Sequence, residues 1–253
     1  MIEKQGLRIA AVSYDSRETL HRFAEKYQIQ FPLLSDRDSA VIRSFGILNT
    51  NIERGLRAHG VPHPVEYLVG PDGKIIRKYF VPNYTHRVAA SAVALLEYGV
   101  ASGDAPVVTL RSGALTVEVG LSTAKGFAGQ EIGFFAKFNL EPGWHVYGAP
   151  LPEAYTTTSV RFDDPKVVRQ SFELPPATPV LVPASGGEFL VHGGSFQGLG
   201  SLLLKFPLDE GKTILVGQVR FQQCSDTVCE APEIHPFKLP LTLEPFMVAT
   251  RTK

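Results

Sequence analysis

The chain has 253 residues, and its 25 Lys and Arg balance its 25 Asp and Glu, so the formal net charge is zero. A chain without a basic excess is not expected to bind nucleic acid or an anionic membrane surface through charge. No apolar run approaches the roughly 20 residues of a membrane-spanning helix. The opening stretch, MIEKQGLRIA, also lacks the apolar segment of a secretory signal. The totals indicate one or two folded domains, large enough to bury a core.

Residues 1–100 alternate strand and helix patterns. The run LRIAAVSY predicts a strand buried on both faces, and Asp15 with Glu18 has the spacing of a helix capping box. Apolar residues at positions 20, 23, 24 and 27 then share one helical face. The stretch VEYLVGPDGKIIRKYF predicts two strands joined by a turn at Gly73, and an apolar stripe over 88–96 predicts a closing helix. This region is therefore predicted to be an α/β domain.

The remaining sequence has a different pattern. Residues 101–106 are small and polar and are predicted to form a linker. From 107 to 253 the apolar positions alternate with polar ones, for example at 115, 117 and 119, and Gly/Pro-rich turns separate the short runs. This pattern predicts an all-β immunoglobulin-like sandwich over 107–253.

The chain's two cysteines, Cys224 and Cys229, lie in the stretch RFQQCSDTVCEAPE. If they flank a four-residue hairpin loop, their Cβ atoms lie about 4.5–5.5 Å apart, and a small adjustment closes a disulfide. The same register pairs Arg220 with Glu233 and position 219 with position 234, which matches charge with charge and apolar with apolar. The sequence thus predicts a hairpin in which the cysteines can bond.

Three roles are open for this pair: a redox-active disulfide, a structural staple, or metal-bound or free thiols. A loop this short removes only roughly 2 kcal/mol of unfolded-state entropy, a small term for a chain of this size. Both cysteines share the parity of the polar positions 218, 220 and 222, which predicts access for a partner thiol. Zinc would need two further ligands, and the seven histidines show no paired spacing. A redox-active pair is favoured, with no metal and no cofactor.

The stretch FQQCSDTVCEAPE resembles the active hairpin of the amino-terminal periplasmic domain of the bacterial thiol:disulfide interchange protein DsbD. The segment LEPGWHVYG resembles a family segment that implies Tyr147 beside the sulfurs. GGEFLVHGG resembles the family's cap loop, which implies an acid at Glu188 near the thiols and a shielding ring at Phe189. Gly187 stands where the family often has a second acid, so electrostatic tuning is expected to be weaker. The resemblance covers 107–246.

This resemblance implies a function. Cys229 is expected to exchange with the partner, and Cys224 to resolve the mixed disulfide. The expected partners are thioredoxin-like proteins or a membrane thiol reductant transporter, including the proteins of cytochrome c biogenesis. The implied location is the periplasm or another extracytoplasmic space. The alternative is a non-catalytic binding or scaffold protein with a structural disulfide.

The segments GLRIAAVSYDS, FPLLSD, SFGIL and HPVEYLVGPDGKI resemble the redoxin (AhpC/TSA) branch of the thioredoxin fold. This resemblance implies a cis proline at Pro64; an ordinary trans turn proline, or Pro62 in its place, is the alternative. Residues 1–100 contain no cysteine, and the family's reactive cysteine belongs to a strand and helix expected upstream of Met1. We therefore expect a truncated redoxin domain, or alternatively a degenerate one used for docking, and no peroxidase activity.

Three further residues near these motifs carry no predicted chemistry. Trp144 and His145 are predicted to belong to the core or the sandwich rim, and His192 to the surface. The glycine-rich stretch GGEFLVHGGSFQGLGS lacks the Gly-Lys-Ser/Thr of a phosphate loop and is read as a cap loop.

Overall fold

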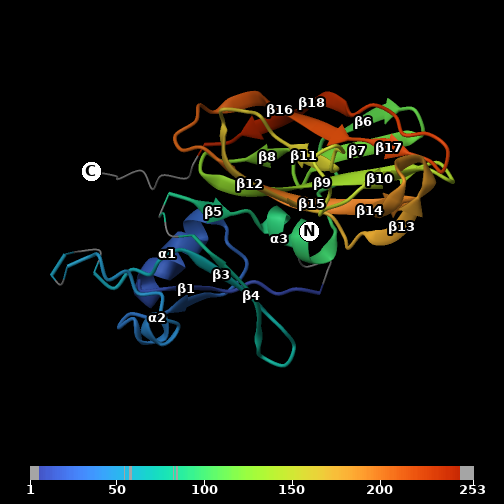
Figure 1. The fold of residues 1–253 in the computed structure, drawn as a ribbon. Coiled ribbons are helices and arrows are strands. Elements are labelled where there is room, and N and C mark those ends of the chain that lie inside the picture. Colours follow the sequence, from blue (N-terminus) through green and yellow to red (C-terminus); the bar gives the residue numbers. More distant parts are fainter. Residues whose placement is uncertain (1–5, 54, 57–58, 82, 84, 246–253) are drawn as a thin grey trace. The chain divides into compact units, whose positions relative to one another are not determined.

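The computed structural model describes residues 6–53, 55–56, 59–81, 83 and 85–245 (Figure 1). The chain divides into two compact units, Met1–Val88 and Ala89–Lys253. Within the described ranges, no helix combines the length and the apolar character that crossing a bilayer requires.

The first unit alternates strands and helices, as predicted. Its elements are β1 (Ala11–Ser13), α1 (Arg17–Tyr27), β2 (Leu33–Ser35), α2 (Ala40–Ser44), β3 (Val65–Val69), β4 (Ile75–Phe80) and β5 (Arg87–Val88). The cap of α1 lies one residue later than expected, because the Ser16 hydroxyl accepts a hydrogen bond from the Thr19 amide at 3.3 Å. Asp15 instead accepts a hydrogen bond from the Ser13 hydroxyl.

Strand β1 is less buried than its sequence predicted. It has three residues and pairs in parallel with β2, with Val12 opposite Leu34. These two side chains are 44% and 51% exposed. The prediction of a strand buried on both faces is therefore wrong for this structure, because β2 is its partner among the described residues and neither face is closed.

Strands β3 and β4 form the predicted hairpin. Gly73 has a φ of 77° in the turn, a region that glycine enters without a steric penalty. The Gly70 amide closes the loop by donating to the Lys74 carbonyl at 2.8 Å.

Helix α3 (Ala90–Tyr98) belongs to the second unit. Ala92, Ala94 and Leu95 are fully buried or nearly so. They pack on β9 (Gln130–Leu140), where Gly133 leaves the room they need: a Cβ there would lie 3.2 Å from the Ala92 Cα. The compact units thus divide at 88/89, whereas the sequence placed this helix in a domain ending at residue 100. The predicted linker is also tied to the second unit, since the Ser102 amide donates to the Ser122 carbonyl.

The second unit is built from three sheets. One has the order β12-β15-β9-β7-β6 and another the order β11-β16-β18-β8; the third has the order β13-β14-β10-β17. Their strands are β6 (Val107–Ser112), β7 (Leu115–Leu121), β8 (Lys125–Gly126), β10 (His145–Tyr147), β11 (Ser159–Arg161), β12 (Val167–Glu173), β13 (Thr178–Val182), β14 (Gly187–Gly193), β15 (Ser195–Leu204), β16 (Gly211–Phe221), β17 (Gln223–Cys224) and β18 (Glu233–Leu243), with a short 3-10 turn at Pro183–Ser185.

The first two sheets pack face to face, with β16 and β18 lying over β9 and β15 (Figure 1). The Phe162 ring contacts both layers. Its centroid lies 5.0 Å from that of Phe134 in β9 and 5.1 Å from that of Phe237 in β18. The predicted alternation is confirmed at 115, 117 and 119 and at 134, 136 and 138, where all six side chains are buried. The mostly β content is as expected, and the immunoglobulin-like class stays a prediction.

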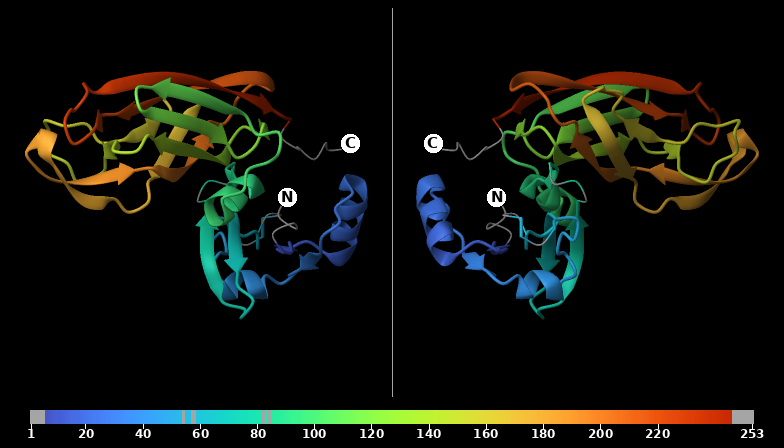
Figure 2. Two further views of the ribbon diagram at one scale, coloured as in Figure 1. Left: turned by 90° about the vertical axis from the view of Figure 1, so that its right-hand side faces the viewer. Right: turned by 90° about the vertical axis from the view of Figure 1, so that its left-hand side faces the viewer.

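The third sheet lies at one end of the second unit (Figures 1 and 2). Strand β10 is its centre, pairing with β14 on one side and with β17 on the other. Because β17 continues directly from β16, one chain segment passes from the sandwich into this end sheet and carries Cys224 with it.

Candidate functional site

The two cysteines form a disulfide that closes a tight loop. Their Cα atoms are 4.1 Å apart, and the two residues pair as an antiparallel bridge. Within the loop, the Ser225 amide donates to the Val228 carbonyl at 2.7 Å. The predicted bonding across a hairpin is confirmed.

The register behind the loop differs from the prediction by one residue. Strand β16 pairs Arg220 with Ile234 and Val219 with His235, rather than with Glu233 and Ile234. Between the last pair of that ladder and the cysteine bridge, residues 222–223 face residues 230–232. The extra residue is accommodated because the chain leaves β18 at the end of β16 and then pairs with β10 as β17, so the two ladders need not share a register.

The cysteines are also less accessible than their sequence parity predicted. Cys224 is fully buried, and Cys229 is partly buried. Gln222 and Gln223, expected on or beside a polar face, are only 7% and 2% exposed. The change of sheet at Phe221 is the reason, because it turns this segment inward.

The two buried glutamines anchor the hairpin. The side-chain oxygen of Gln222 accepts from the Thr156 amide at 3.0 Å, and its nitrogen donates to the Glu230 carbonyl at 3.0 Å. These bonds tie the residue that follows Cys229 to the segment before β11, which stabilises the position of the loop.

Gln223 makes the corresponding bonds on the other side. It accepts from the Ala114 amide at 3.2 Å and donates to the Glu233 carboxylate at 3.2 Å. Burial alone would raise the pKa of Glu233, but hydrogen bonds from Ser112, His235 and Gln223 hold it below its ordinary value. Sequence reasoning missed both anchors, since nothing in the pattern showed that these amides were buried.

Tyr147 lies beside both sulfurs, as predicted. Its hydroxyl oxygen is 3.2 Å from Sγ of Cys224 and 3.5 Å from Sγ of Cys229. A disulfide sulfur carries no proton, so the hydroxyl is the donor in these contacts. The Tyr147 side chain is fully buried at the end of β10.

Aromatic rings cover the disulfide. The rings of Phe189 and Tyr155 pack on the cluster formed by Tyr147, Val182, Val191 and Cys224. The Phe189 centroid lies 5.3 Å from that of Tyr147 and 5.0 Å from that of Tyr155. Phe189 thus packs against the cluster that contains Cys224, and its shielding function stays a prediction.

Glu188 does not join this group. It is exposed and pairs with Leu181, which is 68% exposed, across β13 and β14. Successive strand residues point to opposite faces, so Glu188 faces away from the cluster that Phe189 packs against. The structure therefore brings together Cys224, Cys229, Tyr147 and Phe189, and leaves the expected acid outside.

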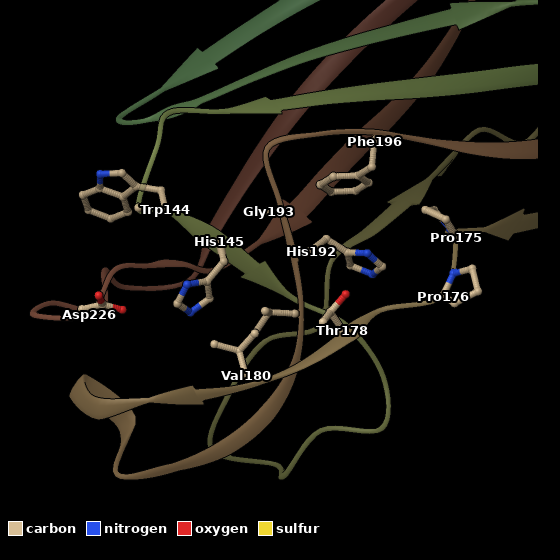
Figure 3. A pocket seen from close by; sticks show the side chains of 12 residues that line it. Trp144, His145, Pro175, Pro176, Thr178, Val180, His192, Gly193, Phe196 and Asp226 are labelled. Atoms are coloured by element: carbon tan, nitrogen blue, oxygen red, sulfur yellow. The ribbon is translucent and has the colours of Figure 1, made fainter.

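A cavity of about 370 Å³ lies beside the disulfide loop (Figure 3). Trp144, His145, His192 and Asp226 are among its lining residues. The imidazoles of His145 and His192 are only 7% and 6% exposed, and burial lowers the pKa of each. The prediction of a surface position for His192 is wrong, because its ring stacks on that of Phe196, with centroids 4.7 Å apart.

The first unit has its own cavity, of about 350 Å³, whose lining includes Pro64, Glu66, Tyr79 and Arg87. The cis prediction for Pro64 is not met: the cis bonds within the described ranges precede Pro150 and Pro207. The trans form is intrinsically favoured by about 0.5–1 kcal/mol, and tertiary contacts must select cis. Burial raises the pKa of Glu66 to about 7, partly offset by the charge of Arg87.

Comparison with known proteins confirms the redoxin resemblance for the first part of the chain. Residues 1–78 match the AhpC/TSA family. Peroxiredoxin Bcp of Escherichia coli (strain K12) is 38% identical over 74 residues, which are 29% of this chain and 47% of that protein. Peroxiredoxin Bcp of Xanthomonas campestris pv. campestris is 30% identical over 92 residues, 35% of this chain and 57% of that protein. The chain thus spans about half the length of the curated relatives it matches.

Solved structures give weaker similarities. The N-terminal periplasmic domain of ScsB from Proteus mirabilis has a TM-score of 0.43 at 15% identity, covering 56% of this chain and 52% of that one. The reduced DsbD N-terminal domain of Neisseria meningitidis has a TM-score of 0.30 at 13% identity, covering 55% of this chain and 85% of that one. A yeast GGA1 GAE domain has the same TM-score at 12% identity, covering 53% of this chain and 97% of that one.

Proposed function

We propose that this protein exchanges thiols and disulfides with partner proteins through Cys224 and Cys229. The observation that carries the proposal is the asymmetry of the pair. Cys224 is fully buried, whereas Cys229 is partly exposed at the end of a four-residue loop. An incoming thiolate therefore reaches one sulfur and not the other, which fixes the order of the steps.

Reduction of the pair proceeds in two displacements. A partner thiolate attacks Sγ of Cys229; the bond to Cys224 breaks, and Cys224 leaves as a thiolate that accepts a hydrogen bond from Tyr147. The partner's second thiolate then attacks its own sulfur in the mixed disulfide, and Cys229 leaves as a thiolate. Two electrons pass from the partner dithiol to the pair, and the partner becomes a disulfide. The reverse sequence, in which Cys224 attacks Cys229, passes the electrons on.

We propose thioredoxin-like proteins or a membrane thiol reductant transporter as partners, and an extracytoplasmic location. Disulfides persist in oxidising compartments, which supports the location. The AhpC/TSA-like unit is not proposed to reduce peroxides, because residues 1–100 contain no cysteine.

A matched pair of variants tests the order of attack. Reduced Cys224→Ser and Cys229→Ser chains are each mixed with glutathione disulfide under native conditions, and the adduct is followed by mass spectrometry. We expect Cys224→Ser to form the adduct at least about tenfold faster, because its remaining thiol is the accessible one. Equal rates would overturn the assignment of Cys229 as the exchanging sulfur.

One observation favours the structural alternative. Cys224 is fully buried and the disulfide is packed under aromatic rings, as an inert cross-link would be. The reduction potential separates the two functions. Structural disulfides lie below about −300 mV, so a value below that limit in the folded chain would assign the bond to stability and exclude an exchange role.

A further inference from the structure

The cavity beside the disulfide is placed to contact whatever approaches Cys229. Asp226, one of its lining residues, belongs to the loop between the two cysteines. His145, another, is the register partner of Cys224 across β10 and β17. A molecule that fills the cavity therefore lies against the loop that ends at Cys229.

One buried polar atom in this cavity has no partner. Among the described residues, the Nε2 atom of His145 makes no hydrogen bond, although the residue is only 7% exposed. A buried polar atom without a partner costs about 1–3 kcal/mol, and buried side chains normally avoid that cost. His145 lines the cavity, so a small rotation of its ring would let a ligand group supply the missing hydrogen bond.

The charges of the lining select the kind of group. Asp226 is the formally charged residue in it, and it is an acid. The buried imidazoles of His145 and His192 do not add compensating positive charge, because desolvation disfavours their protonated forms. The cavity thus offers a carboxylate together with a neutral ring nitrogen.

Aromatic faces complete the lining. Trp144 lies near Asp226 and His145, while the rings of His192 and Phe196 stack at the other side, with centroids 4.7 Å apart (Figure 3). A planar cation that donates several hydrogen bonds fits this combination best, since a guanidinium can stack on a ring while it donates to a carboxylate.

We propose that this cavity binds a guanidinium group, supplied by an arginine side chain of the protein that exchanges with the disulfide. The carboxylate of Asp226 and Nε2 of His145 accept its hydrogen bonds, and the Trp144 ring stacks on its plane. The part of this inference that makes the cavity a recognition site for the partner rests on the proposed function. The part that makes it a guanidinium site does not.

Binding is tested first without any redox step. The oxidised full chain, with its histidine rings labelled with ¹³C, is titrated with N-acetyl-arginine amide and with its neutral isostere N-acetyl-citrulline amide. We expect saturable shifts of the His145 ring signals with arginine only. Asp226→Asn is expected to weaken binding about fivefold. Glu230→Gln removes an acid that directly follows Cys229 and lies outside the lining, and it is expected to leave binding unchanged. Equal shifts with citrulline, or unchanged affinity in Asp226→Asn, would overturn the proposal.

The source of the guanidinium is tested with exchange. The reduced chain is mixed with two disulfide-bearing peptides that differ only in arginine or citrulline two residues from the cysteine. A rate advantage for the arginine peptide that falls about fivefold in Asp226→Asn supports a partner side chain. Binding of free arginine without such an advantage overturns the partner source. If dithiothreitol cannot reduce the pair in the folded chain, the proposed function fails while the binding result stands separately.

Discussion

The hydroxyl oxygen of Tyr147 lies 3.2 Å from Sγ of Cys224, the sulfur that is fully buried. This contact places a hydrogen-bond donor where negative charge appears once the disulfide opens. A buried thiolate is otherwise poorly solvated, so a preorganised donor stabilises it relative to the thiol. The pairing of Tyr147 with Cys224 therefore supports the reversible exchange that we propose for this site.

Tyr147→Phe removes that donor while keeping the ring. We expect resolution by Cys224 to slow by about tenfold at neutral pH, because a hydrogen bond to a charged group contributes about 1.5 kcal/mol or more. The measurement is the decay rate of the preformed mixed disulfide at Cys229 in stopped-flow quench experiments. Tyr98→Phe, in helix α3, is the matched control; equal rates in wild type and Tyr147→Phe would show that the hydroxyl does not act on the sulfur.

Phe189→Ala opens the aromatic cover. We expect dithiothreitol to reduce the disulfide several-fold faster, because the Phe189 ring no longer packs on the cluster that holds the disulfide. The free energy of unfolding should fall by about 2–3 kcal/mol, less than the roughly 3–5 kcal/mol for a fully buried phenyl ring, because Phe189 is only partly buried. Phe172→Ala, a half-buried ring stacked on Phe134 in the sandwich, controls for stability loss alone. If both variants accelerate reduction equally, general loosening rather than shielding accounts for the effect.

Gln222→Ala tests the anchor behind the loop. It leaves the Thr156 amide and the Glu230 carbonyl without their side-chain partner, so we expect a loss of about 1–3 kcal/mol of unfolding free energy. Hydrogen exchange at the Thr156 amide should rise more than exchange within β16. Gln218→Ala, which removes a surface hydrogen bond to Asp163, is the control. An unchanged exchange rate at Thr156 contradicts the anchoring role.

The stability of the first unit should depend on pH through Glu66. Burial raises its pKa from an ordinary value of 4.5 to about 7, so between these two pH values the unfolded chain releases the proton while the folded unit keeps it. The free energy of unfolding therefore falls as pH rises through this window and is flat on either side of it. The slope is about 1.4 kcal/mol per pH unit, and the total fall is at most about 3 kcal/mol.

Glu66→Gln should flatten this pH profile. The measurement is the hydrogen-exchange protection of the Tyr67 amide in the full chain between pH 4.5 and 8, corrected for intrinsic exchange. Glu53→Gln, at an exposed acid of the same unit, should keep the wild-type profile. A wild-type profile that rises across the window would contradict the buried-carboxylate explanation.

Much of the fold could be predicted from the sequence, because the relevant signals are local. The apolar alternation at 115–119 and 134–138 identified strands whose side chains are indeed buried, and the Pro-Asp-Gly turn fixed the β3–β4 hairpin around Gly73. Motif resemblance placed Tyr147 and Phe189 next to the cysteines, and the redoxin resemblance matches the family found for residues 1–78.

The errors share a physical origin. The strand rule that assigned polar positions to a solvent face assumes one sheet, but the chain changes sheets at Phe221, which buries Gln222, Gln223 and Cys224. The capping motif was shifted by one residue because Asp15 and Ser16 can both accept amide hydrogen bonds. The orientation of Glu188 depends on which face of β14 meets the cluster, a property of the third sheet rather than of the cap-loop motif.

By itself, the sequence determined that two sulfurs five positions apart can bond across a hairpin, because that reach is set by local backbone geometry. Tertiary structure alone decided that Cys224 is fully buried, that Glu188 faces away from the sulfurs, and that His145 and Asp226 line a common cavity. These features depend on contacts between strands far apart in the chain. Burial and the protonation states that follow from it arise only when those strands meet.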